Sequence, residues 1–288
     1  MKTRKFLAAA FAGAILMAFV AITFAAGPPK DKNFVVTPEK LAKCGDKGPA
    51  APSCKEAHTD HVWFFYNDVN DTIDNTIGSF VFSQYGPGPF YDNCAPSATC
   101  QTPPLGLGSV QISTVLNRRP NLATYQFGGI SLVDITTLAF STYNPSAGNK
   151  GSSNRSGYLH FNVDFTGNST NFQRRLVYVP QNNGAVTQDN WKEWDAINGG
   201  GAMWNYSGPT WPAPCAAPGS SLKTWAQILA CYPNARVLPG DSFLGIRVGE
   251  PYPDGYTENI DAFKFGTAKG LLTFDFEPVK THKDDDDN

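Results

Sequence analysis

Short segments in which apolar and polar residues alternate recur along this chain of 288 residues. The clearest runs from Tyr158 to Phe165, where His160 lies on the polar face and Phe161 on the apolar one. Such alternation is typical of an antiparallel strand with one face in the core and the other toward solvent. Comparable segments, separated by Gly- and Pro-containing turns, lie at 62–66, 79–82, 110–115, 122–127, 135–143, 176–179, 191–197, 243–248, 260–265 and 272–276.

Only one segment has the spacing of a helix. Leu222, Trp225 and Ile228 lie three apart after a pair of serines, and Pro233 follows, which predicts a short helix near 221–230. The chain also contains 27 glycines and 22 prolines, as expected for many turns. We therefore predict an all-β fold, a two-sheet antiparallel sandwich of jelly-roll type with one short helix. A β-barrel or propeller is the alternative, and no internal repeat supports a propeller.

The N-terminus has the layout of an export signal. A basic head precedes an uncharged run from 6 to 24, and Thr23 and Ala25 supply the small residues that a signal peptidase reads. The alternative is a membrane anchor, since about 19 apolar residues can span a bilayer. The break at Gly27-Pro28-Pro29 favours cleavage after Ala25. A secreted protein, extracellular or periplasmic, is expected.

Four regions are expected in the chain. Residues 1–25 form the signal peptide, 26–60 a spacer with a disulfide loop, 61–277 the β-sandwich domain, and 278–288 an acidic disordered tail. No later stretch is long and apolar enough to span a membrane after cleavage. The net charge of -2 and a content of 17% charged residues exclude an overall basic field for nucleic acid or anionic lipid.

Six cysteines remain after export, and an even number in an exported chain favours disulfides. Sequence alone allows 15 pairings of six cysteines. The cysteines fall into three local couples, each around a Pro- or Gly-containing segment, which favours the pairs Cys44–Cys54, Cys94–Cys100 and Cys215–Cys231. A zinc site is disfavoured, because the cysteine spacing and nearby histidines that it needs are missing.

Two C-terminal segments carry a family resemblance. The sequences GYTENIDAFKFG at 255–266 and TFDFEP at 273–278 resemble secreted bacterial β-sandwich domains of the concanavalin-like or laminin-G-like jelly-roll group, and WKEWD at 191–195 resembles a strand in the middle of such domains. The resemblance covers residues 61–277. It implies an Asp in a late strand, here Asp261, and a last strand that returns to pair near the first. It does not imply an activity, because lectins, enzymes and adhesive modules share such folds.

The first candidate site is a structural calcium site. Asp68, Asn70, Asp71 and Asp74 crowd one turn, and hard cations take six to eight oxygen ligands of this kind. The alternative is that these side chains only make turns and cap strands.

The second candidate is an aromatic platform for a glycan. Trp194, Trp204, Tyr206 and Trp211 lie in a stretch punctuated by Gly and Pro, and sugar rings stack on exposed flat aromatics. The last three lie in the loop-like part and are the best candidates for exposure. The alternative is packing in the sandwich core.

The third candidate is a paired-carboxylate site for hydrolysis or lysis of glycans. Glu193 and Asp195 are two apart and so share a strand face, and Glu258 is a further available acid. No Gly-x-Ser-x-Gly motif supports a serine hydrolase. His160 is expected to be solvated, and Arg118-Arg119 and Arg174-Arg175 to be surface charges.

These observations favour a secreted carbohydrate-binding or cell-surface recognition module without catalytic activity, with a glycan or cell-surface polysaccharide as partner. A glycan-active hydrolase or lyase is the first alternative, and a structural envelope or matrix protein is the second.

Overall fold

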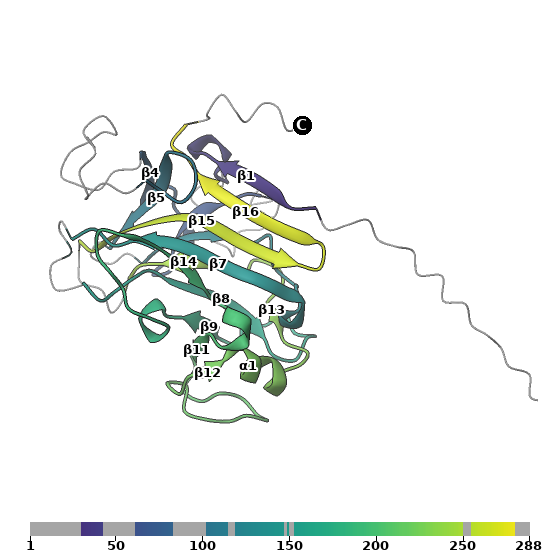
Figure 1. Cartoon of the computed structure of the whole chain (residues 1–288). Helices are drawn as coiled ribbons and strands as arrows, with labels where there is room; N and C mark the ends of the chain where they lie inside the picture. The colour runs from purple at the N-terminus through teal and green to yellow at the C-terminus, as the bar shows by residue number, and fades with distance from the viewer. Residues whose placement is uncertain are drawn as a thin grey trace, which may run out of the picture.

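The computed structural model describes residues 30–42, 61–82, 102–114, 119–146, 149, 153–249 and 255–279. These residues form two large sheets packed against each other, which confirms the predicted all-β sandwich (Figure 1). The predicted signal peptide, the predicted pairs Cys44–Cys54 and Cys94–Cys100, and the tail beyond residue 279 lie outside the described residues.

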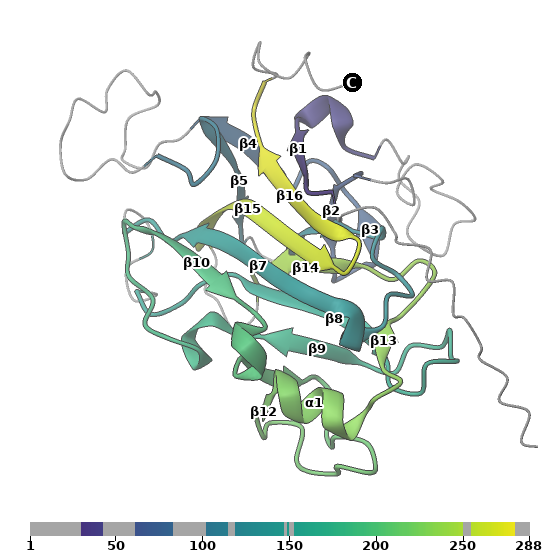
Figure 2. The ribbon, with the colours of Figure 1, turned by 45° about the vertical axis from the view of Figure 1, so that its right-hand side comes forward.

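The first sheet has seven strands. They are β1 (Lys32–Val36), β4 (Gly78–Phe82), β5 (Gly108–Ser113), β7 (Ile135–Tyr143), β10 (Trp191–Asp195), β15 (Thr257–Thr267) and β16 (Gly270–Phe276). One edge of β15 pairs with β7, while the other pairs first with β5 and then with β16 (Figure 2). The change of partner coincides with a register shift between Asp261 and Lys264, where Ala262 has a φ of 52°. This bulge lets one strand connect both parts of the sheet.

Strand β1 lies within the segment that was expected to be a spacer. It pairs in parallel with β16, with Phe34 opposite Phe274. The ordered sandwich therefore begins before residue 61, and the last strand pairs with the first described strand. The exposed Lys32 and Asn33 and the short length of β1 hide its strand pattern, because only its last residue, Val36, is fully buried.

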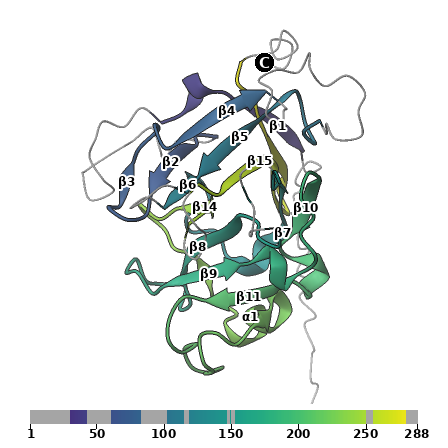
Figure 3. The same ribbon diagram turned by 90° about the vertical axis from the view of Figure 1, so that its left-hand side faces the viewer.

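The second sheet has nine strands (Figure 3). In spatial order eight of them are β12 (Lys223–Thr224), β11 (Met203–Tyr206), β9 (Arg175–Tyr178), β8 (Tyr158–Asp164), β14 (Leu244–Arg247), β6 (Pro120–Thr124), β2 (Phe64–Asn67) and β3 (Thr72–Ile73), and β13 (Arg236–Val237) pairs with β8. Leu159, Phe161 and Val163 face the core between the sheets, as the alternation in β8 predicts. The expectation that the other face of β8 is solvated is wrong, because His160, Asn162 and Asp164 are also buried. The opposite face of the same sheet is free to carry polar side chains.

Aromatic rings fill the space between the sheets. Trp63 is fully buried and meets three phenylalanines of the first sheet edge-on, at ring-centroid distances of 5.1 to 5.3 Å. Edge-to-face pairs of this kind are favourable beyond the burial of their surface. The sandwich is thus held together by contacts between residues far apart in the sequence.

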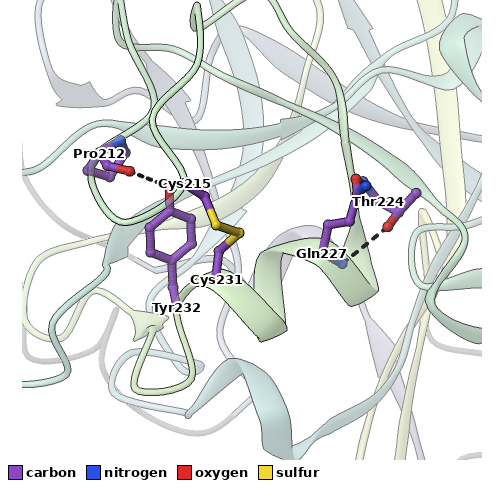
Figure 4. The surroundings of a disulfide bond; sticks show 6 residues. All are labelled: Pro212, Cys215, Thr224, Gln227, Cys231 and Tyr232. Carbon is purple, nitrogen blue, oxygen red and sulfur yellow. Dashed lines mark hydrogen bonds between the residues drawn. A yellow bond between two sulfur atoms is a disulfide. The ribbon is translucent and has the colours of Figure 1, made fainter.

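The predicted helix forms, but it begins later than expected. Helix α1 runs from Trp225 to Cys231, because Lys223 and Thr224 belong to β12 and Thr224 caps the helix by accepting a hydrogen bond from Gln227 N at 3.1 Å (Figure 4). Short 3-10 turns lie at Pro38–Lys40, Leu132–Asp134, Pro180–Asn182 and Asn198–Gly200. Among the residues described, no helix has the length and apolar character needed to cross a lipid bilayer.

The predicted pair Cys215–Cys231 is confirmed. This disulfide joins the last turn of α1 to the preceding loop across 16 positions of sequence (Figure 4). The next residue, Tyr232, donates a hydrogen bond from its hydroxyl to Pro212 O at 2.7 Å. The loop is therefore tied to the helix both covalently and by a hydrogen bond.

Candidate functional site

The four aromatic residues expected to form a glycan platform belong mainly to the core. Trp194, Trp204 and Trp211 are each at most 3% exposed. Trp204 donates from Nε1 to Ala196 O at 2.9 Å, and Trp211 from Nε1 to Ser221 O at 2.8 Å. Tyr206 is partly buried and packs against the core cluster. The expectation of an exposed platform at these tryptophans is therefore wrong.

The physical reason lies in strand β11. Trp204 and Tyr206 are two apart on this strand, so both point to the core face of the nine-stranded sheet. The Gly- and Pro-rich surroundings of this stretch suggested a loop, whereas residues 203–206 pair with β9 on one side and β12 on the other. Core packing, the alternative considered for these residues, is what the structure shows.

The candidate catalytic carboxylates are not brought together across a cleft. Glu193 is half exposed and forms an ion pair with Lys264. Asp195, on the same exposed face of β10, accepts hydrogen bonds from the backbone of Ile197 and Asn198 at 2.9 and 2.7 Å. Glu258 is 0% exposed, so it cannot share a solvent-filled site with the other two.

Glu258 belongs to a buried hydrogen-bonded group instead. Ser156 Oγ donates to its carboxylate at 2.8 Å, and the Tyr256 hydroxyl donates to its other oxygen. Burial raises the pKa of Glu258 to about 8, although these hydrogen bonds lower it. The carboxyl group is therefore largely protonated at neutral pH.

Three of the four residues of the candidate calcium turn use their side chains in hydrogen bonds to residues nearby in the sequence. Asn70 accepts from Thr72 at 2.7 Å, Asp71 from the Tyr66 hydroxyl at 2.9 Å, and Asp74 from Thr76 N at 3.0 Å. Asp68 is the exception, because it pairs with two arginines. Within the described ranges, no group of three or more His, Cys, Asp and Glu side chains is placed to hold a metal ion. The contacts are those of turn chemistry.

Asp68 is the centre of a charged group on the outer face of the nine-stranded sheet. Arg175 from β9 donates to its two oxygens from Nη1 and Nη2, at 2.6 and 2.7 Å. Arg247 from β14 also donates to Asp68 from Nη1. The side chains are 5% exposed for Asp68, 17% for Arg175 and 9% for Arg247, so the group is largely withdrawn from water. Paired, charge-assisted contacts of this kind are strong and fix geometry.

The strands place a histidine and an asparagine beside these charges. Across the sheet, Arg247 lies between Tyr158 on β8 and Asn121 on β6. Asn121 Nδ2 donates to two backbone carbonyls, so its Oδ1 accepts from Nε2 of His160 at 2.6 Å. Burial, together with the positive charges of Arg175 and Arg247, holds the pKa of His160 well below its usual range. This histidine is a neutral, buried donor, and the expectation that it is solvated is wrong.

Several arginines gather around the Tyr158 hydroxyl on this face. The charges that act on the Tyr158 hydroxyl come from Arg247, Arg175 and Arg119, which are positive, and from Asp68, which is negative. Three arginines and Asp68 therefore lie close enough to this hydroxyl to act on it. Arg247 Nε is buried and has no hydrogen-bond acceptor in the described part of the chain. We call Asp68, Arg119, Arg175 and Arg247 the arginine face.

Aromatic rings flank the arginine face. The Arg247 guanidinium lies 5.6 Å from the centroid of the Tyr158 ring, and that of Arg175 lies 5.1 Å from Phe243 and 6.0 Å from Phe172. Phe172 is 55% exposed, which is unusual for a phenylalanine. An exposed aromatic ring beside an arginine side chain can contact a ligand that has both an apolar surface and an anionic group.

Sequence reasoning missed the arginine face, because its members are far apart in the chain. Arg175 and Arg247 are 107 and 179 positions from Asp68. The sequence did carry one signal of this site. The alternation in β8 correctly predicted that Tyr158 and His160 lie on one face of the strand. The arginines were expected to be independent surface charges, and for Arg175 the ion pair with Asp68 shows that this is wrong.

Comparisons with known proteins leave the chain without a family assignment. No protein-family model, curated protein or solved structure matches it. Its two packed sheets are compatible with a β-sandwich of the kind that its C-terminal motifs resemble. The arginine face is therefore interpreted from its own geometry.

Proposed function

We propose that this chain is an exported recognition module that binds acidic glycans without catalysis, with the arginine face as its binding surface. The observation that carries the proposal is the group of arginines on one sheet face, of which Arg119 and Arg175 are partly exposed, beside the exposed ring of Phe172. A uronate residue offers the matching chemistry, because its carboxylate pairs with guanidinium groups and its C–H face packs against an aromatic ring.

One further feature supports this proposal. The Cys215–Cys231 disulfide fits an oxidising compartment, in keeping with the signal-like N-terminus and with secretion. The two-sheet sandwich is compatible with a binding module but does not by itself favour one, because such folds carry many functions. The separation of Glu193 and Asp195 from the buried Glu258 gives the hydrolase or lyase alternative no support.

The test is isothermal titration calorimetry with polygalacturonate and, as a matched ligand, its methyl ester, which has the same backbone without the charge. We expect binding of the acid, weakened by added salt, and roughly tenfold weaker binding of the ester. Equal binding of both polymers, or of neither, would contradict the proposal.

A pair of variants tests the surface. Phe172→Ala removes an exposed ring and is expected to weaken binding while leaving the thermal unfolding midpoint unchanged within error. Val133→Ala is the control, because Val133 is 60% exposed and lies on a different element. If both variants bind as the wild type does, Phe172 is not part of the binding surface.

A further inference from the structure

A pocket of about 340 Å³ opens beside the hairpin formed by β15 and β16. Its walls come from β1, from both strands of the hairpin, from the segment after β6 and from His61. Figure 1 shows β1 alongside β16, with β15 on the other side of β16. The volume lies within the range of small-molecule sites. None of the residues that line this pocket belongs to the arginine face.

The floor of the pocket is apolar. Phe127 and Phe265 stack with their ring centroids 3.9 Å apart and an angle of 10° between the rings. Both are at most 3% exposed, and Ile130 and Leu272 pack against the core next to them. We call Phe127 and Phe265 the phenylalanine floor. Such a surface favours an apolar part of a ligand over water.

The rim of the pocket is cationic. Lys30, Lys32 and Lys269 line it and are exposed, and we call them the lysine rim. No hydrogen bond or ion pair of their ammonium groups is formed with the described residues. The neighbouring Asp31 uses its carboxylate to accept a hydrogen bond from Leu271 N at 3.0 Å. No Asp or Glu occurs among the described residues that line the pocket.

One wall of the pocket is polar and held in place. His61 N donates to Gln126 Oε1 at 2.9 Å, and Gln126 Nε2 donates to Thr124 Oγ1 at 3.0 Å. The His61 ring stacks on Phe34 of β1, with centroids 3.5 Å apart. These contacts join the wall to both sheets, so the pocket is largely formed before a ligand binds.

We propose that this pocket binds an amphiphilic anion, with the apolar part of the ligand on the phenylalanine floor and its carboxylate or phosphate group at the lysine rim. The floor excludes a fully hydrophilic ligand, because burying unpaired polar groups is costly. The rim selects against cationic and neutral head groups of the same length. The site does not depend on the proposed glycan binding, since it uses other residues on another part of the fold.

The test is calorimetry of the mature protein with decyl phosphate and decanoate below their micelle concentrations. Three matched probes serve as controls. Decanol lacks the negative charge, decyltrimethylammonium carries a positive charge instead, and inorganic phosphate lacks the alkyl chain. We expect both anionic amphiphiles to bind, decanol to bind roughly tenfold more weakly, and the other two not to bind. Equal binding of decanol and decanoate, or binding of inorganic phosphate alone, would overturn the proposal.

Variants distinguish binding in the pocket from non-specific electrostatic attraction of the anion to surface lysines. Lys32→Glu with Lys269→Glu is expected to weaken decanoate binding by roughly tenfold. Lys223→Glu on β12 is the control, because it makes the same kind of charge change away from the pocket. This variant is expected to bind decanoate normally. Leu272→Trp fills the pocket without changing charge and is expected to abolish binding. If circular dichroism shows that this variant does not fold, Ile130→Trp is used in its place. Normal decanoate binding by whichever of these variants folds would contradict the proposal that the ligand binds in the pocket.

A final arm separates a free amphiphile from a membrane surface as the source of the ligand. Vesicles containing phosphatidylglycerol are sedimented with the protein, and vesicles of phosphatidylcholine alone are the comparison. Binding of soluble decanoate that is lost in the filled variant supports the pocket. Binding to anionic vesicles without any binding of soluble decanoate would instead indicate attraction to a charged surface and overturn the proposal.

Discussion

Asp68 and Arg175 are 107 positions apart in the chain and are joined by two hydrogen bonds, at 2.6 and 2.7 Å. Arg247 donates to the same carboxylate, so strands β9 and β14 are linked through one residue that follows β2. The charge of Asp68 offsets part of the positive charge on the outer sheet face. It also fixes the orientation of the arginines that we propose to bind a glycan.

Removal of that negative charge is expected to destabilise the fold. Asp68→Asn leaves two largely buried guanidinium groups without their counter-charge, and breaking a buried pair in this way costs about 3 to 5 kcal/mol. Urea unfolding measures the change. Asp134→Asn, an exposed acid in the 3-10 turn at 132–134, is the control and is expected to change stability by less than about 0.5 kcal/mol. Similar midpoints for the two variants would contradict the role given to Asp68.

The pH dependence of stability is expected to report two buried acids. Burial raises the pKa of Glu258 from 4.5 to about 8 and that of Asp261 from 3.8 to about 7. At a pH between the unfolded and folded pKa of each acid, that carboxyl group is protonated in the folded chain and ionised in the unfolded chain. The free energy of unfolding therefore falls as pH rises from about 5 to 7, by about 1 kcal/mol per pH unit for each acid, and levels off above about 8.

Amide variants test which residues cause the pH dependence of the free energy of unfolding. Glu258→Gln and Asp261→Asn cannot titrate, so each is expected to remove part of the slope between pH 5 and 7, and the double variant most of it. Chemical denaturation at several pH values gives the slopes. A wild-type stability that rises over this interval would show that the two carboxyl groups are not held protonated in the fold.

Trp204 is expected to matter for folding rather than for ligand contact. It is 0% exposed and packs against the rings of Phe161, Tyr178 and Trp225. Trp204→Ala leaves a cavity and is expected to cost about 3 to 5 kcal/mol of stability. Trp204→Phe retains part of the packing and is expected to cost less. Loss of glycan binding in a Trp204→Phe variant with near-normal stability would contradict the burial of this residue in the core.

The disulfide is expected to stabilise the fold by an amount that depends on the length of the loop that it closes. Replacement of Cys215 and Cys231 by alanine frees a loop with a sequence separation of 16, which corresponds to about 3 kcal/mol. Thermal unfolding of the double variant measures the loss. Reduction is expected to lower the midpoint of the wild type by more than that of the alanine variant, which lacks this disulfide.

Much of the fold was predictable, because alternation is a local property. β7, β8 and β16 lie where period-two segments were identified, and the core face of β8 was predicted residue by residue. β12 and β13 are two residues long, so no periodicity can show. β1 was missed for a related reason, since it has only five residues and begins with the exposed Lys32 and Asn33.

The candidate sites were harder to predict than the fold. Trp204 carried a real strand signal, because Trp204 and Tyr206 are two apart, but Gly and Pro nearby favoured a loop. The arginine face had no local signal at all, since Asp68 meets its partners only when β2, β9 and β14 come together in one sheet. Pairwise contacts of this range are decided by sheet order, which periodicity does not determine.

The most direct test of the proposed glycan binding is an NMR titration of the protein with trigalacturonate, observing backbone amides and arginine Nε–H groups. We predict shifts concentrated on the outer face of β8, β9 and β14, with the largest changes at Arg175, Arg247 and the backbone of Phe172. Shifts confined to other surfaces, or no shifts at saturating ligand, would contradict the assignment of the arginine face as the glycan-binding surface.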